Sequence, residues 1–157
     1  MCIRDRFLTP HSDIVALMVL GHQTHVHNLM TLAAHTSSTP VMESLVKAML
    51  FSGAAVFTDP IKGTSPFADE FSKRGPRDSR GRSLYELDLQ TRLLRYPLTY
   101  LIYSKSFDAM PATVKTYVFK RLREVLSGQD QTAPFAHLSA ADRQAILDIL
   151  KETKPGI

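Results

Sequence analysis

The chain has 157 residues, of which 44% are hydrophobic and 22% are charged, and its formal net charge is +4. This length predicts one domain, and the composition is typical of a globular protein that can bury a substantial core. No apolar run approaches the roughly 18 residues needed to span a bilayer, so we expect no transmembrane segment.

The N-terminal hexapeptide, residues 1–6, resembles the translated adapter sequence found at the broken ends of genes from short-read assemblies. We therefore expect the natural sequence to enter at about Phe7, with its own N-terminus and any signal region missing. The only cysteine, Cys2, lies in this hexapeptide. The rest of the chain therefore has no thiol for a disulfide, a thiolate zinc site, a catalytic nucleophile or a C-x-x-C-H haem attachment.

Apolar residues spaced three and four apart, bounded by capping residues and by Gly or Pro, predict a series of helices. In chain order these cover residues 12–34, 39–51, 65–75, 83–95, 111–128 and 139–154. The start signals are Ser12, Thr39, Ser65, Ser83 and Ser139, and the stops include Gly75, Gly128 and Pro155. Ser83 with Glu86, and Ser139 with Asp142, have the spacing of a capping box.

The apolar stretch over residues 96–103 is the one place where a strand competes with a helix, because it is rich in aromatic and β-branched residues. A strand there would lack pairing partners, so we predict a buried helix. The sequence therefore predicts an all-α fold, an irregular bundle of about six helices that forms a single domain over residues 7–157.

Three histidines fall in the run HQTHVHN, inside the first predicted helix. At 100° per residue, Val15, Val19 and Val26 lie within about 60° of His22. His25 lies at about −60°, at the edge of the same apolar stripe, and His27 lies at about 140°, among polar residues. We therefore expect His22 and His25 to point towards the core and His27 towards water.

Met18, His22 and His25 share one flank of this helix and are the candidate ligands for a cofactor. Imidazole binds transition metals, and His or Met can be axial to haem iron, so the candidate cofactor is haem or a transition metal. A metal site would use His11, His22 and His25, with Glu43 or Asp88 as further candidates. The alternative is that His22 and His25 are structural and bond to nearby carbonyls or carboxylates.

The other motifs give weaker indications. His27 and His35 are expected at the surface, and His137 in a loop beside the last helix cap. The loop over residues 73–82 carries five cations and one anion, which could bind phosphates, and Arg74, Arg77, Arg80 and Arg82 are its arginines. No aromatic residues interleave with them, so we favour a solvated loop whose arginines pair with carboxylates, and nucleic acid is not the expected partner.

Four strings carry a family resemblance: FLTPHSDIVALMVL with the following HQ and HN pairs, RGPRDSRGRSL, RYPLTYLIYS, and LSAADRQAIL with TKPG. Together they resemble the C-terminal part of large, exported, uncharacterised bacterial proteins, some of which are associated with c-type cytochrome features. The resemblance implies an exported or periplasmic location and an upstream domain of the same polypeptide as partner. His22 and His27 stand at the HQ and HN positions, whereas Gly21 replaces an expected acidic residue, which weakens the case for a complete metal site.

These observations lead to a first hypothesis and two rivals. The first is the helical C-terminal domain of an exported redox protein, with His22 and His25 near a haem or metal. The second is a non-catalytic helical interaction or scaffold domain with structural histidines, and the third is a nucleic-acid-binding domain that uses the basic loop. Whether the domain is an enzyme stays open.

Overall fold

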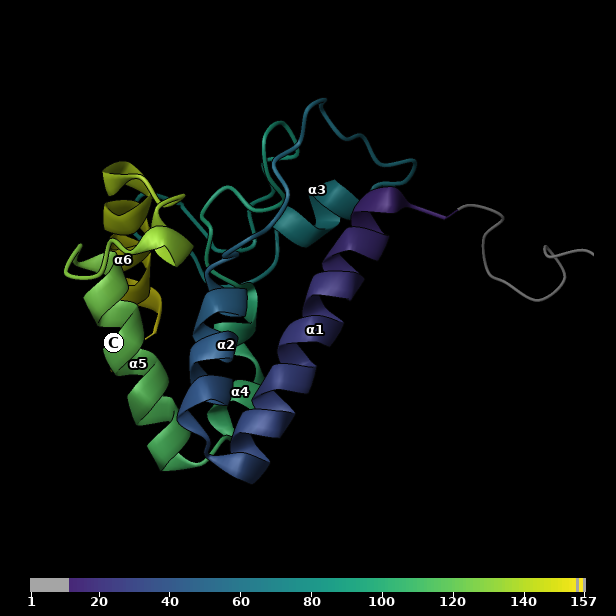
Figure 1. Ribbon diagram of the computed structural model, residues 1–157. Helices are drawn as coiled ribbons and strands as arrows, with labels where there is room; N and C mark the ends of the chain where they lie inside the picture. The colour runs from purple at the N-terminus through teal and green to yellow at the C-terminus, as the bar shows by residue number, and fades with distance from the viewer. Residues whose placement is uncertain (1–11, 155, 157) are drawn as a thin grey trace, which may run out of the picture.

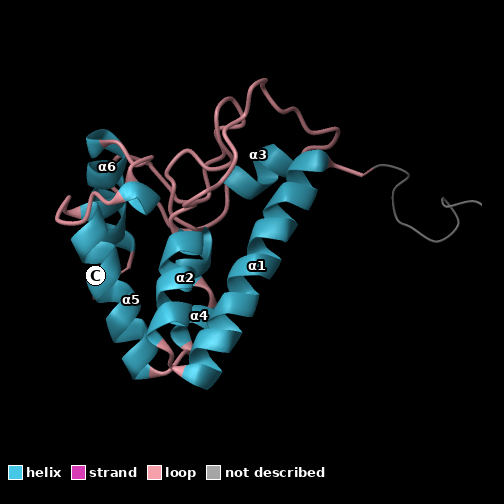
Figure 2. Cartoon of the chain, viewed as in Figure 1, coloured by secondary structure: helices cyan, strands magenta, loops and turns pink. Residues whose placement is uncertain are grey.

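The computed structural model describes residues 12–154 and 156, so residues 1–6 and His11 lie outside the described residues. Its α-helices are α1 (Ile14–Thr36), α2 (Thr39–Met49), α3 (Phe67–Ser72), α4 (Lys105–Asp108), α5 (Ala112–Leu126) and α6 (Ala140–Thr153). Two short 3-10 helices, η2 (Tyr100–Tyr103) and η3 (Ala133–Phe135), complete them. Within the described ranges no β-strand occurs, which confirms the predicted all-α bundle (Figure 2).

The helices are arranged around α2, which lies between α1 and α5 (Figure 1). α1 and α2 form an antiparallel pair, α5 packs on the other side of α2, and α6 packs against α5. Long loops gather at the end of the bundle where α1 begins and α2 ends. These loops, and not a helix, form much of the surface between α1 and η3.

α1 begins at Asp13, which is the N-cap, one residue after the Ser12 that the sequence suggested. One carboxylate oxygen of Asp13 accepts the N–H groups of Val15 and Ala16, at 2.8 and 3.1 Å. The other accepts the N–H and the hydroxyl of Ser65, at 2.9 and 2.6 Å. The Ser65 hydroxyl is the largest cause that lowers the pKa of Asp13, to about 2, so this carboxylate stays charged and holds the 63–65 loop on α1.

The helix predicted over residues 111–128 is confirmed by α5, which has one apolar face. All five of its members are buried: Val114, Val118, Leu122, Val125 and Leu126. They face the buried side of α2, including Leu45, Val46 and Met49, in the main core. Removal of these side chains from water is the dominant favourable contribution to folding.

α6 confirms the second capping box. The Ser139 hydroxyl accepts the Asp142 N–H at 3.0 Å, and the Asp142 carboxylate accepts the Ser139 N–H at 3.2 Å. Arg143, one helical turn after Ser139, is buried although no carboxylate pairs with it in the described structure. Its guanidinium donates to four backbone carbonyls, those of Val125, Asp130, Phe135 and Leu138. It thereby ties the end of α5 and the following loop to α6.

The helix predicted over residues 83–95 is wrong. Glu86 does accept the Ser83 N–H at 3.1 Å, as in a capping box, but the chain then turns. The Asp88 carboxylate accepts the N–H groups of Thr91 and Arg92, at 3.0 and 3.1 Å, which closes a turn where a helix would have used those donors differently. Leu89 has a φ of 59°, which is incompatible with a right-handed helix.

The apolar stretch over residues 96–103 is buried as predicted, but it is helical only over η2. Before η2 the chain is extended, and the Thr99 N–H donates to the Met49 carbonyl at the end of α2, at 2.9 Å. This contact places Thr99 beside both α1 and α2. Thr99 is therefore close enough to contact side chains of both helices.

Candidate functional site

A groove of about 890 Å³ opens between α1, the end of α2 and the loops beside them. Its walls come from α1, from the C-terminal end of α2, and from three loop segments, residues 52–57, 91–97 and 133–137. Most of its lining is apolar, including Met18, Val56, Leu93 and Pro134. This size and character match small-molecule sites, which are concave, largely apolar and carry a few polar groups.

His22 reaches the groove from α1 and is held from two sides. Its Nε2 lies 2.9 Å from the Thr99 Oγ1, and its ring stacks on that of Phe51, with 4.2 Å between centroids and 15° between planes. Burial, and to a smaller extent the nearby His25, lower the pKa of His22 to about 4. His22 is therefore neutral at pH 7 and joins α1 to the end of α2 and to the segment before η2.

The hydrogen bonds assign a tautomer to His22. Thr99 is fully buried, and its Oγ1 accepts the Leu101 N–H at 3.4 Å. A buried hydroxyl proton needs an acceptor, and the His22 Nε2 is the acceptor within reach of Thr99. Thr99 therefore donates to Nε2, which leaves the proton of the neutral imidazole on Nδ1.

Phe51 occupies a backbone conformation that usually requires glycine. Its φ is 58°, and it directly follows the last turn of α2. The Ser52 N–H donates to the Lys47 carbonyl at 2.9 Å and the Phe51 N–H to the Ala48 carbonyl at 3.2 Å, which is the Schellman pattern of a helix C-terminus. Left-handed φ costs a non-glycine residue about 1–2 kcal/mol, so the stacking and burial of Phe51 must offset that cost.

His137 lies in the loop before α6, as predicted, and forms another part of the groove wall. Its Nε2 lies 2.8 Å from the Leu50 carbonyl oxygen, which can only accept, so Nε2 carries a proton. The contact joins the loop after η3 to the end of α2. His137 and His22 thus both tie the end of α2 to segments from elsewhere in the chain.

Among the described residues, the charged side chains that line the groove are two cations, Lys47 and Arg92, and none is acidic. The Arg92 guanidinium makes two contacts with the Asp142 carboxylate, at 2.6 and 3.2 Å, and so its charge is balanced. Glu43, four residues before Lys47, is the expected helical partner of that lysine, but its carboxylate binds the Arg121 guanidinium at 3.0 Å. Within residues 12–154 no carboxylate lies within ion-pairing distance of the Lys47 Nζ.

The structure brings only two of the predicted ligands together. Met18 and His22 both line the groove. His25 is exposed, so its expected orientation towards the core was wrong, and His27 is half-buried where we expected it to face water. The reason is that the buried side chains of α1 centre about 40° beyond His22, which leaves His25 and His27 each about 100° from that centre.

The donor set around His22 does not fit a metal ion. Among the described residues no group of three or more His, Cys, Asp or Glu side chains could hold one, and His11 lies outside the described residues. The further candidates are engaged elsewhere, since Glu43 binds Arg121 and Asp88 closes the turn at Thr91. For haem, the Nε2 of His22 would first have to leave Thr99.

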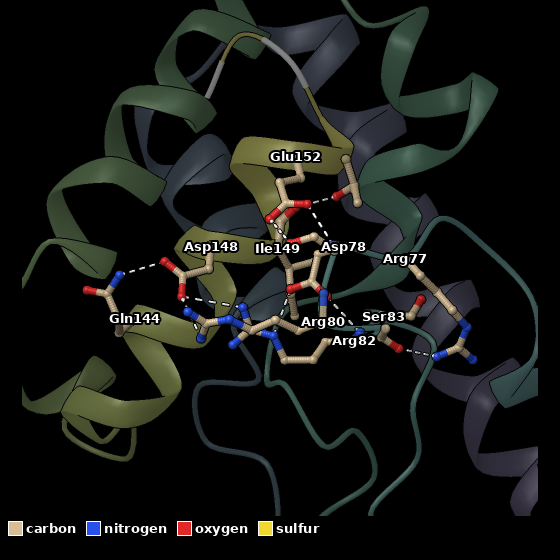
Figure 3. A network of polar contacts seen from close by, with 12 residues as sticks. Arg77, Asp78, Arg80, Arg82, Ser83, Gln144, Asp148, Ile149 and Glu152 are labelled. Atoms are coloured by element: carbon tan, nitrogen blue, oxygen red, sulfur yellow. Dashed lines mark hydrogen bonds and ion pairs between the residues drawn. The ribbon is translucent and has the colours of Figure 1, made fainter.

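The basic loop has its own network of ion pairs (Figure 3). Asp148 of α6 lies 3.4 Å from Arg82 and 3.8 Å from Arg80, and Arg82 also binds Asp78 at 2.7 Å. The Glu152 carboxylate accepts the N–H and the hydroxyl of Ser79, at 2.7 and 2.9 Å. The interpretation of these arginines as partners of nearby carboxylates is confirmed for Arg80 and Arg82, and also for Arg77, which pairs with Glu86.

Sequence reasoning missed two residues of the groove, Lys47 and Phe51, and the buried Thr99 that holds His22. Lys47 looks like an ordinary surface lysine in the sequence, because no local pattern shows that Arg121 binds Glu43, its expected helical partner. Phe51 and Thr99 read as core residues, and the stacking and the hydrogen bond to His22 depend on chain segments 29 and 77 residues away. The one signal in the sequence was Gly53, a helix-breaking residue shortly after Met49, the last residue of α2.

Comparison of the chain with family models, with curated proteins and with solved structures gives no match. None of the helices in the described ranges combines the length and the apolar character needed to cross a membrane.

Proposed function

We propose that this chain is a non-catalytic helical interaction domain in which the histidines are structural. The observation that carries the proposal is the state of His22. Its ring is neutral, its Nε2 accepts the Thr99 hydroxyl, and its face is covered by Phe51. Such a ring stabilises the packing of three chain segments and has no free nitrogen at Nε2 for a ligand.

An apolar stripe on α1 supports an interaction role. Ile14, Leu17 and Leu20 are spaced three residues apart, and their exposed fractions are 48%, 53% and 56%. They lie on the side of α1 turned away from the core, and neighbouring exposed apolar side chains of this kind mark contact surfaces. The partner proposed here is the upstream domain of the same polypeptide, exported to the periplasm, as the family resemblance implies.

A second candidate is the redox domain of the first hypothesis. One observation favours it: Met18 and His22 open onto the same groove, and this pair of side chains serves as axial ligands in haem proteins. Binding of haem iron would require the Thr99 bond of His22 to break. A single experiment separates the two candidates.

The experiment is the titration of the purified protein with haemin and, separately, with Zn²⁺, Cu²⁺ and Ni²⁺, followed by absorption spectra and metal analysis. The interaction domain predicts neither a ligated Soret band nor stoichiometric metal that depends on His22. A Soret band or a 1:1 metal complex that is abolished by His22→Gln, but not by His35→Gln at an exposed position, contradicts the proposal and establishes the second candidate.

The stripe has its own test. Leu17→Gln with Leu20→Gln should leave the melting temperature of this chain unchanged within about 2 °C, because exposed positions contribute little to stability. The same pair of substitutions should lower the melting temperature of the longer polypeptide by several degrees. An unchanged melting temperature in the longer polypeptide would remove the stripe from the proposed interface.

A further inference from the structure

The groove differs from the rest of the surface in the balance of its charges. In the whole chain 19 Lys and Arg residues stand against 15 Asp and Glu residues, so acidic side chains are common. None of the acidic residues that the structure describes lines the groove, whereas Lys47 and Arg92 do. His22 adds no charge because its ring is neutral at pH 7.

Only one of these two cations is available to a ligand. Arg92 is committed to the Asp142 carboxylate and to the Arg95 carbonyl, at 2.6 and 2.8 Å. Lys47 stands in the last turn of α2, and its expected partner Glu43 is taken by Arg121. A single ammonium group with no salt bridge in the described structure therefore stands beside an apolar wall, with Glu43 near enough that Lys47, after Arg121, helps to lower the pKa of that carboxylate.

The apolar wall is mainly aliphatic. Met18, Val56, Leu93 and Pro134 come from four different segments and face a common space of about 890 Å³. Val56 is 77% exposed and lines the groove. A ligand that extends from Lys47 along this wall would remove Val56 from water.

We infer that the groove binds an amphiphilic monocarboxylate, with its carboxylate on the Lys47 ammonium and its aliphatic chain along Met18, Val56 and Leu93. Charge complementarity selects an anion, because a cation would meet Lys47 with no acidic residue to balance it. The single available ammonium selects one carboxylate in preference to a dianion. The inference goes beyond the proposed function and shares with it only the structural role of His22.

Isothermal titration calorimetry with decanoate, below its micelle concentration, tests the inference, with acetate and decyltrimethylammonium as matched probes. Acetate keeps the anion without the chain, and decyltrimethylammonium keeps the chain with the opposite charge. We expect 1:1 binding of decanoate and at least tenfold weaker binding of each matched probe. In the NMR spectrum, the Met18 methyl resonance should move with decanoate.

Substitutions at Lys47 test whether the carboxylate of the ligand binds there. Lys47→Gln should weaken decanoate binding by roughly tenfold, the loss expected for a charge-assisted contact at a half-exposed site. Lys47→Arg should restore binding, and Lys105→Gln, at an exposed lysine of α4, should leave it unchanged. The melting temperature of each variant verifies that the fold is kept.

Three results overturn the inference: no binding of decanoate, equal binding of decanoate and decyltrimethylammonium, or equal affinity of the wild type and Lys47→Gln. A fourth is tighter, Lys47-dependent binding of a short peptide with a free C-terminal leucine, which assigns the groove to a protein C-terminus. All four leave the haemin and metal titrations untouched, so failure here is distinguishable from failure of the proposed function.

Discussion

The Nε2 of His22 and the Oγ1 of Thr99 lie 2.9 Å apart, although 77 residues separate them in the chain. Through this bond and the stacking on Phe51, His22 joins α1 to two other segments, the chain just before η2 and the end of α2. Because Thr99 is fully buried behind His22, its hydroxyl loses the acceptor that it has in the folded protein if His22 is removed. The first two predictions follow from this arrangement.

His22→Ala should lower the free energy of unfolding by about 1–3 kcal/mol, since it orphans a buried hydroxyl and leaves a void beside Phe51. His27→Ala should change it by less than about 0.5 kcal/mol, because no side-chain contact of comparable kind holds His27. Urea denaturation of both variants is the measurement. Equal and small effects would show that the His22 contacts contribute nothing to stability.

The pH dependence of stability should carry the signature of His22. Its folded pKa of about 4 lies below the ordinary value of 6.5, so the unfolded chain binds more protons between these two values. The contribution to stability is complete above about pH 6.5 and is lost as the pH falls towards 4. We expect a loss of about 1–2 kcal/mol between pH 7 and pH 5.

Denaturant titrations at pH 5, 6 and 7 measure this slope, and the variant His22→Gln should flatten it. His35→Gln, at an exposed position of α1, should keep the slope of the wild type. The window above pH 5 is chosen because carboxylates with lowered pKa, such as Asp13 and Asp130, act below it. Retention of the full slope in His22→Gln would assign the effect to another group.

Phe51 should reverse the usual order of alanine and glycine. Both Phe51→Ala and Phe51→Gly lose the stacking on His22, and so both should be less stable than the wild type. At a φ of 58°, however, the glycine variant should be the more stable of the two by about 1 kcal/mol. Ala48→Gly, inside α2, should show the ordinary order with a loss of about 1 kcal/mol. Thermal melts of the three variants decide the matter.

Two glycines with the same φ of 76°, Gly75 and Gly81, form a matched pair. A Cβ at Gly81 meets nothing within 4 Å, so Gly81→Ala should cost only the left-handed backbone term, about 1 kcal/mol. A Cβ at Gly75 would overlap the ring of Tyr85, so Gly75→Ala should cost at least about 2 kcal/mol more. Similar stabilities of the two variants would mean that Tyr85 moves aside freely.

Arg143→Lys should be strongly destabilising although the substitution keeps the positive charge. The guanidinium serves four carbonyls from the end of α5 and the loop after it, including Val125 and Phe135. A lysine ammonium, with its three donors at a single nitrogen, cannot reach all four carbonyls. Each buried carbonyl left without a donor is costly, so we expect the free energy of unfolding to fall by about 2 kcal/mol or more. Arg123→Lys, at an exposed position of α5, is the control and should be neutral. Calorimetric melts of both proteins provide the comparison.

Two copies of one motif show how far local pattern predicts structure here. Ser139 and Asp142 form a capping box that begins α6, whereas Ser83 and Glu86 form a similar turn that begins no helix. After Ser139, a full helical face of buried residues follows, including Ile146 and Ile149. After Ser83, the Asp88 carboxylate accepts the N–H groups of Thr91 and Arg92. Leu84 and Leu94, at the two ends of this segment, are both buried. Tertiary packing overrode the local helical preference.

The sequence by itself determined the all-α class, the positions of α1, α2, α5 and α6, and the orientation of His22 towards the apolar side of α1. These features follow from spacing over three or four residues and from capping, which are local and therefore readable from the chain.

Only the tertiary structure decided the groove and its charge. Lys47 forms no salt bridge among the described residues because Arg121, 78 residues from Glu43, takes the carboxylate that the local pattern would have given it. His25 faces water because the core of α1 centres on one side of His22, a direction set by α2 and not by α1 itself. Interactions between segments far apart in the chain carry no local periodicity, so they appear only when the helices are packed together.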